Sequence, residues 1–553
     1  MPESSENPEP AESPEDPEQP EIPSAARRND AYDYDVLVIG SGFGGAVSAL
    51  RLSEKGYRVG VLEAGQRFTR ETLPASSWDL TKFLWAPALG LYGIQRIHLL
   101  SNVMILAGAG VGGGSLNYAN TLYVPPPAFF QDRQWGHITD WQEELKPFYD
   151  QARRMLGVRL NPTMTPSDVH LRDTAERMGI GDTFHLAPVG VFFGDGRDAA
   201  HAPEAPANGQ DDPGSPDDPA APAGPRAAPG DEVPDPYFGG AGPARRACVE
   251  CGECMTGCRH GAKNTLMENY LYLAEQAGAV IHPMTTVVEV REERPGGEDG
   301  APGTDTGFLV STVPTAARRG RGTRRRTGRA GAAANGPRGM RTLRARRVVI
   351  AAGTYGTQSL LHRMRDSGVL PRVSDKLGFL TRTNSEALVG AQTIKRRYRS
   401  RWGRDATLDF TRGVAITSSI HPNENTHIEP VRYGRGSNAM SALTTLQVPQ
   451  HSALPKPLAY LGVCLRHPVH FARSLSARRW SERIIIGLVM QSLDNSLTTH
   501  RRDKGLGKGV LTARQGHGAP NPVHIPEAAE FASTLAGELN GFAGSNVGEL
   551  MGT

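Results

Sequence analysis

The glycine cluster at residues 40–45, GSGFGG, has the residue types and spacing that dinucleotide binding requires. It fits the pattern G-x-G-x-x-G, in which the first glycine permits a tight turn and the second lets the backbone approach a pyrophosphate. The third glycine lets a helix pack closely on a strand, so that the helix N-terminus faces the anion. The cofactor-binding residues predicted here are Gly40, Gly42, Phe43, Gly44 and Gly45.

The elements that must position this cluster can be read on both sides of it. Residues 34–39 form an apolar, β-branched run typical of a buried strand, and residues 46–55 have helical periodicity closed by Gly56. Glu63 ends a second strand at the spacing expected of a carboxylate that accepts hydrogen bonds from a ribose diol. No arginine follows it to indicate a 2′-phosphate, so the pattern predicts a bound dinucleotide and redox chemistry. The alternative is a tight turn without a ligand.

Four cysteines form a second group with the spacing of ligands. Cys248, Cys251, Cys254 and Cys258 follow C-x2-C-x2-C-x3-C, the ligand run of bacterial ferredoxins, with Arg259 in place of the usual proline. Three interpretations remain open: an iron–sulfur cluster, one tetrahedral zinc ion, or four reduced thiols that shape a loop. An iron–sulfur centre would let electrons leave the redox cofactor and would favour a dehydrogenase over an oxidase.

The composition of the whole chain limits its class. The 553 residues carry a net charge of only +3, which argues against a dedicated nucleic-acid binder. Residues 1–30 read as a disordered acidic tail, and residues 194–245 and 295–344 read as low-complexity insertions, the latter with a basic run at 318–329. No apolar run reaches the length of a bilayer span. Five cysteines without a secretory segment predict a reducing compartment, so the expected location is cytoplasmic.

Two further segments extend the first motif. Residues 108–117, GAGVGGGSLN, are glycine-rich enough for backbone amides to lie against a flat, charged ligand. Residues 347–354, RVVIAAGT, predict a buried strand that ends in a tight turn at Gly353, and residues 355–364 then predict a helix.

With these motifs the chain resembles the glucose-methanol-choline (GMC) flavin oxidoreductases, and within them the cholesterol-oxidase-like branch. The residues that carry the resemblance are the first glycine cluster with Glu63 and the segments 108–121, 348–361 and 377–386. The resemblance implies FAD, with the 108–121 segment along the flavin and pyrophosphate. The chain departs from the family at residues 117–120. It reads NYAN there, whereas secreted cholesterol oxidases have a sequence similar to VNGG at this place. The cofactor-binding residues added by the resemblance are Gly108, Gly113, Gly114, Asn117, Tyr118, Val288 and Gly353.

The expected fold class is α/β (α+β overall): a Rossmann-like FAD-binding domain with a second, mainly antiparallel-sheet substrate domain. Alternating apolar and polar residues after position 385 predict the second sheet, which would form a pocket wall over the flavin. The predicted segments are a tail (1–30), the first part of the FAD-binding domain (31–125), a cap (126–193), an insertion (194–245), a cysteine-rich segment with an FAD-domain strand (246–294), a basic insertion (295–344), the rest of the FAD-binding domain (345–384) and the substrate domain (385–553).

The resemblance also implies the reaction, in which a sterol or related lipid alcohol is oxidised to a ketone, with O2 or another acceptor taking the electrons. Glu429, in the segment THIEP, is similar to the glutamate that moves a proton during steroid double-bond migration. The histidine and the asparagine or second histidine that activate the hydroxyl group in the family are expected beyond Thr553, and His500, His517 and His524 match no family motif.

The sequence therefore leaves three alternative functions open. They are a sterol oxidase, a dehydrogenase of a smaller alcohol that uses a metal or iron–sulfur centre, and an inactive truncated flavin-binding protein. The apolar residues within 80–106 predict either ordinary core or an apolar entrance that makes peripheral contact with a membrane.

Overall fold

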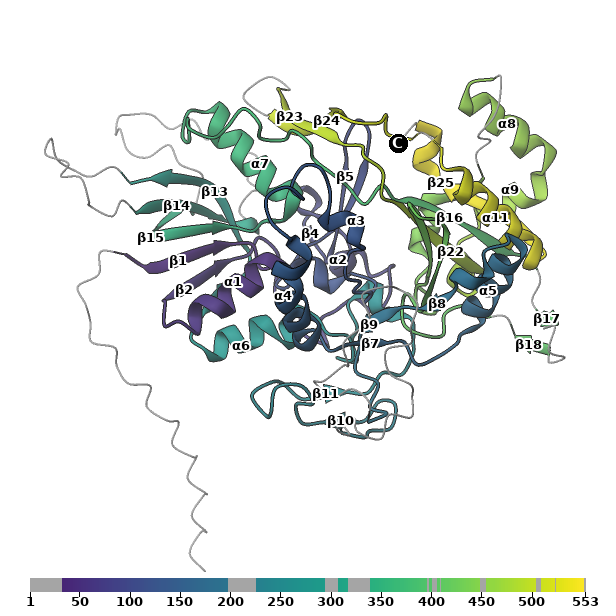
Figure 1. Ribbon diagram of the computed structural model, residues 1–553, viewed down its shortest axis with the longest axis horizontal. Helices are drawn as coiled ribbons and strands as arrows, with labels where there is room; N and C mark the ends of the chain where they lie inside the picture. Colours follow the sequence, from purple (N-terminus) through teal and green to yellow (C-terminus); the bar gives the residue numbers. More distant parts are fainter. Residues whose placement is uncertain are drawn as a thin grey trace, which may run out of the picture.

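The computed structural model describes residues 32–196, 225–293, 307–316, 339–394, 397–399, 405–407, 409–447, 454–503, 509–522 and 524–551. The predicted acidic tail and the arginine-rich run at 318–329 lie outside these residues. Two large sheets organise the described chain, one built around the first glycine motif and the other formed mainly by the C-terminal half (Figure 1).

The first sheet has six strands in the order β12-β2-β1-β15-β14-β13. The first four of these run parallel, and β14 and β13 continue the sheet antiparallel. In spatial order the strands are β12 (Val280–His282), β2 (Val59–Leu62), β1 (Tyr34–Ile39), β15 (Arg341–Ile350), β14 (Phe308–Pro314) and β13 (Thr285–Glu292).

Helices cover both faces of this sheet, which explains why β2 and the second half of β1 are apolar without alternation. Val36 and Val38 of β1 pack against α1 (Phe43–Ser53) and α6 (Tyr270–Gln276). The alternate residues Leu37 and Ile39 point to the other face, where they pack with α7 (Gly353–Asp366). The predicted strand at 34–39 and the predicted helices after the two glycine turns are therefore present, and helices flank the sheet on opposite sides in Figure 1.

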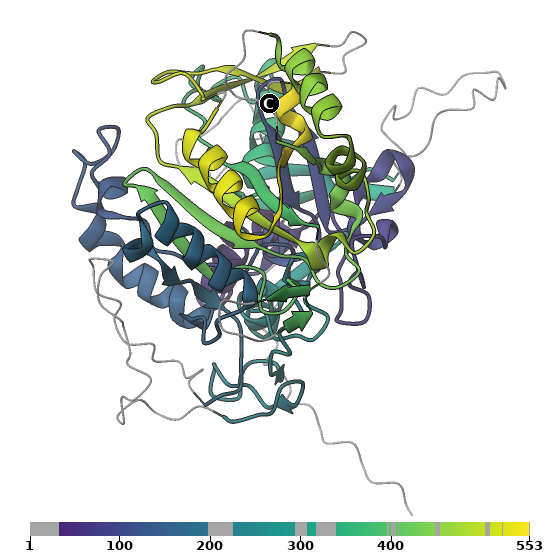
Figure 2. The same cartoon turned by 90° about the vertical axis from the view of Figure 1, so that its right-hand side faces the viewer.

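The second sheet is antiparallel and has seven strands in the order β21-β25-β16-β22-β20-β19-β8. Its outer face is covered by α11 (Pro526–Glu538) and α5 (Pro166–Arg177), which lie along it in Figure 2. The strands are β21 (Thr444–Leu446), β25 (Gly541–Asn546), β16 (Ala387–Thr393), β22 (Ile484–Gln491), β20 (Thr426–Val431), β19 (Ser418–Asn423) and β8 (His185–Leu186).

Further elements lie outside the two large sheets. The strand pairs are β3 (Trp85–Ala86) with β4 (Leu91–Tyr92), β5 (Gln95–Leu99) with β6 (Met104–Gly108), β7 (Val158–Leu160) with β9 (Pro188–Gly190), β10 (Glu232–Val233) with β11 (Arg245–Arg246), β17 (Arg397–Arg399) with β18 (Asp405–Thr407), and β23 (Leu497–Asp503) with β24 (Gly509–Gln515). The remaining α-helices are α2 (Leu80–Phe83), α3 (Pro127–Phe130), α4 (Trp141–Met155), α8 (Lys456–Arg466), α9 (Pro468–Ser474) and α10 (Trp480–Arg483).

The predicted fold class is confirmed: a mixed α/β sheet carries the glycine motif, and an antiparallel sheet forms the second unit. Within the predicted insertion 194–245, the part that the structure describes packs onto the protein, because Tyr237 and Arg245 are buried. In the described residues no helix is long and apolar enough to cross a bilayer.

The packing of α11 on the second sheet can be tested at one phenylalanine. Phe531 is fully buried, and a Cβ added at Gly487 of β22 would lie 2.4 Å from its ring, so the ring fits directly over a glycine. Phe531→Ala should lower the free energy of unfolding by about 3–5 kcal/mol, because it leaves a cavity in the core. Phe148→Ala, on the exposed face of α4, should change it by less than about 0.5 kcal/mol. Denaturant unfolding of both variants measures the difference, and equal midpoints would contradict this packing.

Candidate functional site: a glycine cradle beside a polar sheet face

The turn between β1 and α1 is held in a geometry that only glycine permits. Gly40 has φ +101°, and a Cβ there would lie 2.4 Å from the Ala351 carbonyl oxygen of the segment after β15. A Cβ at Gly45 would lie 1.9 Å from the Gly40 carbonyl oxygen. The turn therefore draws α1 close to the end of the strand, which aims the helix N-terminus at the carboxyl edge of the parallel sheet.

The second glycine segment passes directly over the first. Gly113 has φ +54°, and a Cβ built on it would lie only 2.7 Å from the Gly42 Cα atom. Ser41 ties the two segments together, since its Oγ accepts a hydrogen bond of 3.1 Å from the Gly112 amide. The Gly108 and Gly114 positions lie in the same segment, where Gly108 ends β6 and Gly114 belongs to a 3-10 turn, Gly113–Leu116. The structure thus brings together two predicted motifs that are about 70 residues apart.

Glu63 is buried directly after β2, and its carboxylate accepts hydrogen bonds that hold the turn between β1 and α1 in place. The Ser41 hydroxyl donates to its Oε2 at 2.7 Å, and the Gly65 amide donates to its Oε1 at 2.8 Å. The carboxylate therefore lies beside the first turn of the motif, where a ribose was predicted to bind.

The two glycine segments, 40–45 and 108–114, together form a cradle. The space around this cradle fits an anionic dinucleotide. A Cβ placed at Gly42 or Gly44 would meet no atom within 4 Å, so the backbone there is open to a ligand. An adjoining hollow of about 340 Å³ is lined by Gly44, Ala351, Gly353 and the start of α7. The first turn of α1 carries no acidic side chain that would repel a phosphate. Residues with these properties would hold the pyrophosphate of FAD, whose flavin supplies hydride transfer when bound.

The other predicted cofactor residues lie on separate elements. Tyr118 lies edge-on to Phe43, with ring centroids 6.0 Å apart, and its hydroxyl donates to the Asn264 carbonyl at 3.0 Å. Asn117 is buried and donates to the Gln95 side chain at 2.8 Å. Val288 lies where the register between β13 and β14 shifts, and its carbonyl accepts a bond of 2.6 Å from Arg363 of α7.

Glu429 lies on the inner face of the second sheet. In β20, Ile428 faces the core under α11, so Glu429 and Val431 point the opposite way, and Val431 packs with Ala119 of the second glycine segment. Glu429 is buried, and its Oε1 has no hydrogen-bond partner among the described residues. A buried carboxylate oxygen without a partner is costly and is common where a substrate or water binds.

Sequence analysis missed several polar residues beside Glu429. His427 lies two residues earlier on the same strand face, with its Nε2 3.7 Å from Glu429 Oε1. The His421 ring stacks between His185 and His427, and burial lowers the pKa of His421 to about 4. The Tyr123 hydroxyl lies 3.3 Å from His185 Nε2. Strand alternation could have found His427, but His185 reaches this face only because β8 pairs with β19.

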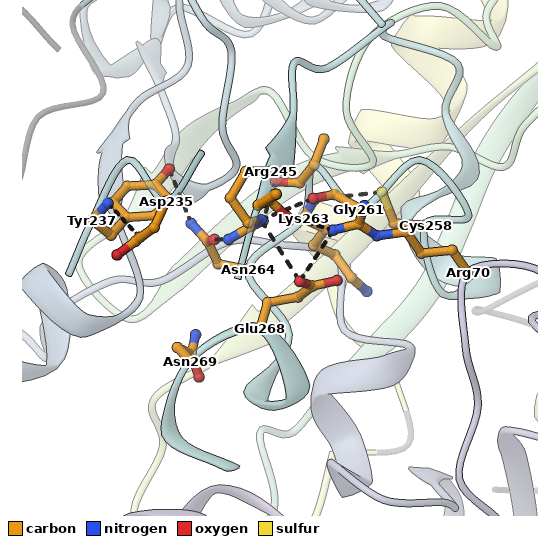
Figure 3. Close-up of polar contacts among 12 residues, drawn as sticks. Arg70, Asp235, Tyr237, Arg245, Cys258, Gly261, Lys263, Asn264, Glu268 and Asn269 are labelled. Atoms are coloured by element: carbon orange, nitrogen blue, oxygen red, sulfur yellow. Dashed lines mark hydrogen bonds and ion pairs between the residues drawn. The ribbon is translucent and has the colours of Figure 1, made fainter. Parts of the chain in front are cut away.

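The cysteine loop lies between the two sheets, beneath the second glycine segment. Arg245 is buried and donates to the carbonyls of Gly261 and Ala262 and to the Asn264 side chain, which fixes the chain after Cys258 (Figure 3). Burial raises the pKa of Cys254 to about 11. Burial lowers the pKa of the neighbouring Lys263 to about 8, although the nearby cysteines oppose that shift.

Comparison with known proteins identifies the class. Residues 35–79 match a family model described as an FAD binding domain. The cholesterol oxidase of Mycobacterium tuberculosis (strain CDC 1551 / Oshkosh) is 53% identical over 525 residues, which cover 94% of this chain and 79% of that protein. The cholesterol oxidase of Acinetobacter baumannii is 36% identical over 521 residues, covering 94% and 82%. Pyridoxine 4-oxidase from Mesorbium loti, a solved structure, has a TM-score of 0.43 at 12% identity, covering 92% of this chain and 79% of that one.

The cradle and these similarities define an FAD-dependent oxidoreductase of the GMC type, so the predicted FAD cofactor and enzyme class are confirmed. Within that class the similarity extends over nearly the whole chain. The chain belongs to the cholesterol-oxidase-like branch of the GMC oxidoreductase family.

A substitution at Gly42 tests the cradle without disturbing the fold. Gly42 has extended backbone angles that valine adopts readily, and its surroundings are open. Gly42→Val should therefore fold but weaken FAD binding at least about tenfold, or about 1.4 kcal/mol, because the side chain fills the space of the pyrophosphate. Gly537→Ala, which adds a methyl group in open space on α11, should bind FAD normally. Flavin fluorescence titration of the apoproteins measures both, and unchanged affinity in Gly42→Val would place the cofactor elsewhere.

Proposed function

We propose that this chain oxidises the hydroxyl group of a sterol to a ketone, with FAD taking the hydride. The observation that carries the proposal is the 53% identity to a cholesterol oxidase across 94% of this chain. The proposed cofactor contacts are those of the cradle: Gly40 to Gly45, Glu63, the 108–118 segment, Val288 and Gly353. O2 or another small acceptor reoxidises the flavin.

The arrangement of the two sheets supports a substrate site between cradle and sheet. Asn120, fully buried, accepts from the Ala415 amide at 3.1 Å and donates to the Ile416 carbonyl at 3.3 Å. This double contact fixes the chain next to the flavin-lining residue Tyr118 against the second sheet. Glu429 faces the same inner layer, since its strand neighbour Val431 packs with Ala119 there.

Within this site we assign proton transfer during double-bond migration to Glu429. The carboxylate is shielded from bulk water and its Oε1 is unpartnered in the described structure, so a substrate carbon acid can use it as a base. Glu386 lies close by: burial raises its pKa, and Glu429 adds to that effect while Asn384 opposes it.

Replacing this carboxylate separates the two reactions. Glu429→Gln should oxidise cholesterol at a rate within a few-fold of the wild type but lose isomerisation by about 100-fold or more, because an amide cannot accept the proton. Glu424→Gln, in the exposed turn between β19 and β20, should preserve both. Product analysis with a sterol panel, together with hydrogen peroxide detection, distinguishes the ketone from its isomer. Isomerisation that survives in Glu429→Gln would remove the assignment, whereas a flavin-loaded wild type inactive on every sterol would remove the proposed substrate.

We further propose that the β3–β6 region contacts a lipid surface and that the protein resides in the cytoplasm. Leu89 and Leu99 are 69% and 68% exposed, while Phe83 and Ile94 of the same region are buried core. The region thus carries exposed leucines beside buried core residues. All five cysteines are free, which suits a reducing compartment.

Vesicle sedimentation tests the lipid contact. The double variant Leu89→Glu, Leu99→Glu should bind cholesterol-containing phosphatidylcholine vesicles at least about fivefold more weakly, because two charges would have to enter the interface. Tyr57→Glu, exposed in the turn after α1, is the control and should bind as the wild type does. Equal sedimentation of the double variant and the wild type would contradict the contact.

A further inference from the structure

One short loop brings four thiols to a single hollow. On both sides of the 3-10 turn Glu253–Thr256 the backbone reverses, with positive φ at Glu250 and Gly252 before it and at Gly257 and Cys258 after it. Glycine accommodates two of these positions, but Cys258 adopts φ +64° although it has a side chain. The result is a small hollow, with about 10 Å³ of free space, lined by all four cysteines of the C-x2-C-x2-C-x3-C run. In two-cluster ferredoxins the fourth cysteine of such a run serves another cluster, whereas here it lines the same space.

The spacing of the sulfur atoms favours a cluster over a single ion. A tetrahedral zinc ion with Zn–S bonds of about 2.3 Å holds its sulfurs about 3.8 Å apart. Among the described residues no three cysteine sulfurs lie within 4.8 Å of one another. Nevertheless all four cysteines line one and the same hollow. This intermediate spacing suits ligands at separate corners of a larger inorganic core.

A mixed set of ligand atoms at the edge of the loop is a weaker alternative. Cys251, Glu253 and His260 lie within 4.8 Å of one another. The Glu253 carboxylate, however, already accepts two hydrogen bonds from Arg259, at 3.0 and 3.1 Å. Arg259 is the residue that replaces the usual proline of the ferredoxin run. A metal at this edge would have to break that ion pair, and it would leave Cys248, Cys254 and Cys258 unused.

A buried cation at the hollow calls for negative charge inside it. Lys263 lines the hollow and is 1% exposed, and its ammonium donates only to carbonyls, those of Cys254, Leu116 and Tyr118. In the part of the chain that the structure describes, no carboxylate forms an ion pair with it. A buried charge without a counter-charge is strongly destabilising, and an anionic metal–thiolate centre would supply that charge. Backbone amides already donate to two of the sulfurs, from Glu250 to Cys248 and from Lys263 to Cys258.

We propose that Cys248, Cys251, Cys254 and Cys258 together bind one iron–sulfur cluster. The most suitable core is a four-iron, four-sulfide cube, which takes four thiolate ligands. The site lies next to the flavin-lining segment, because the Lys263 ammonium bridges the Cys254 carbonyl, at 2.7 Å, and the Tyr118 carbonyl, at 3.1 Å. The proposal does not depend on the sterol as substrate, since it rests on the cysteine loop alone.

Metal and sulfide analysis of anaerobically purified full-length protein tests this site. The wild type, as isolated or after reconstitution with ferrous iron and sulfide, should contain about four iron atoms and about four acid-labile sulfides per chain. Cys251→Ser and Cys254→Ser should each lose at least half of both. Cys464→Ser changes the remaining, buried cysteine in α8 and should retain the full amount. Electron paramagnetic resonance after dithionite reduction should give a cluster signal in the wild type and in Cys464→Ser.

The outcomes are distinct. Equal amounts of iron and sulfide that depend on the four cysteines support the cluster. Zinc without sulfide, or a wild type that contains neither iron nor sulfide after reconstitution, overturns it. If a serine variant fails to fold, as judged by circular dichroism and FAD content, the wild-type analysis still decides between these results.

Discussion

The structure depends on the contact between two backbone segments that approach without side chains between them. Gly113 lies over Gly42, and Gly45 lies against the Gly40 carbonyl, so that any Cβ at Gly45 or Gly113 would overlap main-chain atoms. Ser41 and Glu63 fasten the same corner through short hydrogen bonds. Because van der Waals overlap is steep, this contact fixes where the helix N-terminus points and where a pyrophosphate can lie. It also leaves Gly42 open on the side that faces the ligand.

From this corner the chain extends to the second sheet through a few buried polar residues. Asn120 bonds to both Ala415 and Ile416, and Lys263 joins the carbonyls of the second glycine segment to that of Cys254. Each polar group is costly to bury unless it is paired, so these bonds define one relative position of cradle, cysteine loop and sheet. The inner face that carries Glu429 and His427 is thereby held beside the second glycine segment.

Local motifs made the cradle predictable from the sequence. The strand at 34–39, the turn at Gly40, the helix that follows and the acid at Glu63 each follow from neighbouring residues, and so does α7 after Gly353. The resemblance to GMC oxidoreductases supplied FAD and the role of the second sheet. Two of the histidines beside Glu429 could not be found in this way, because His185 and His421 meet through pairing of strands more than 200 residues apart. Likewise, nothing local marks Lys263 as a buried cation or Arg245 as the buried clamp on the cysteine loop.

The measurement that most directly tests the account is the FAD content of the purified full-length chain. The account predicts a yellow protein with a bound-flavin spectrum and about one FAD per chain, or an apoprotein that takes up one equivalent of FAD on titration, as the single cradle requires. A correctly folded protein that is colourless and binds no FAD on titration would contradict it.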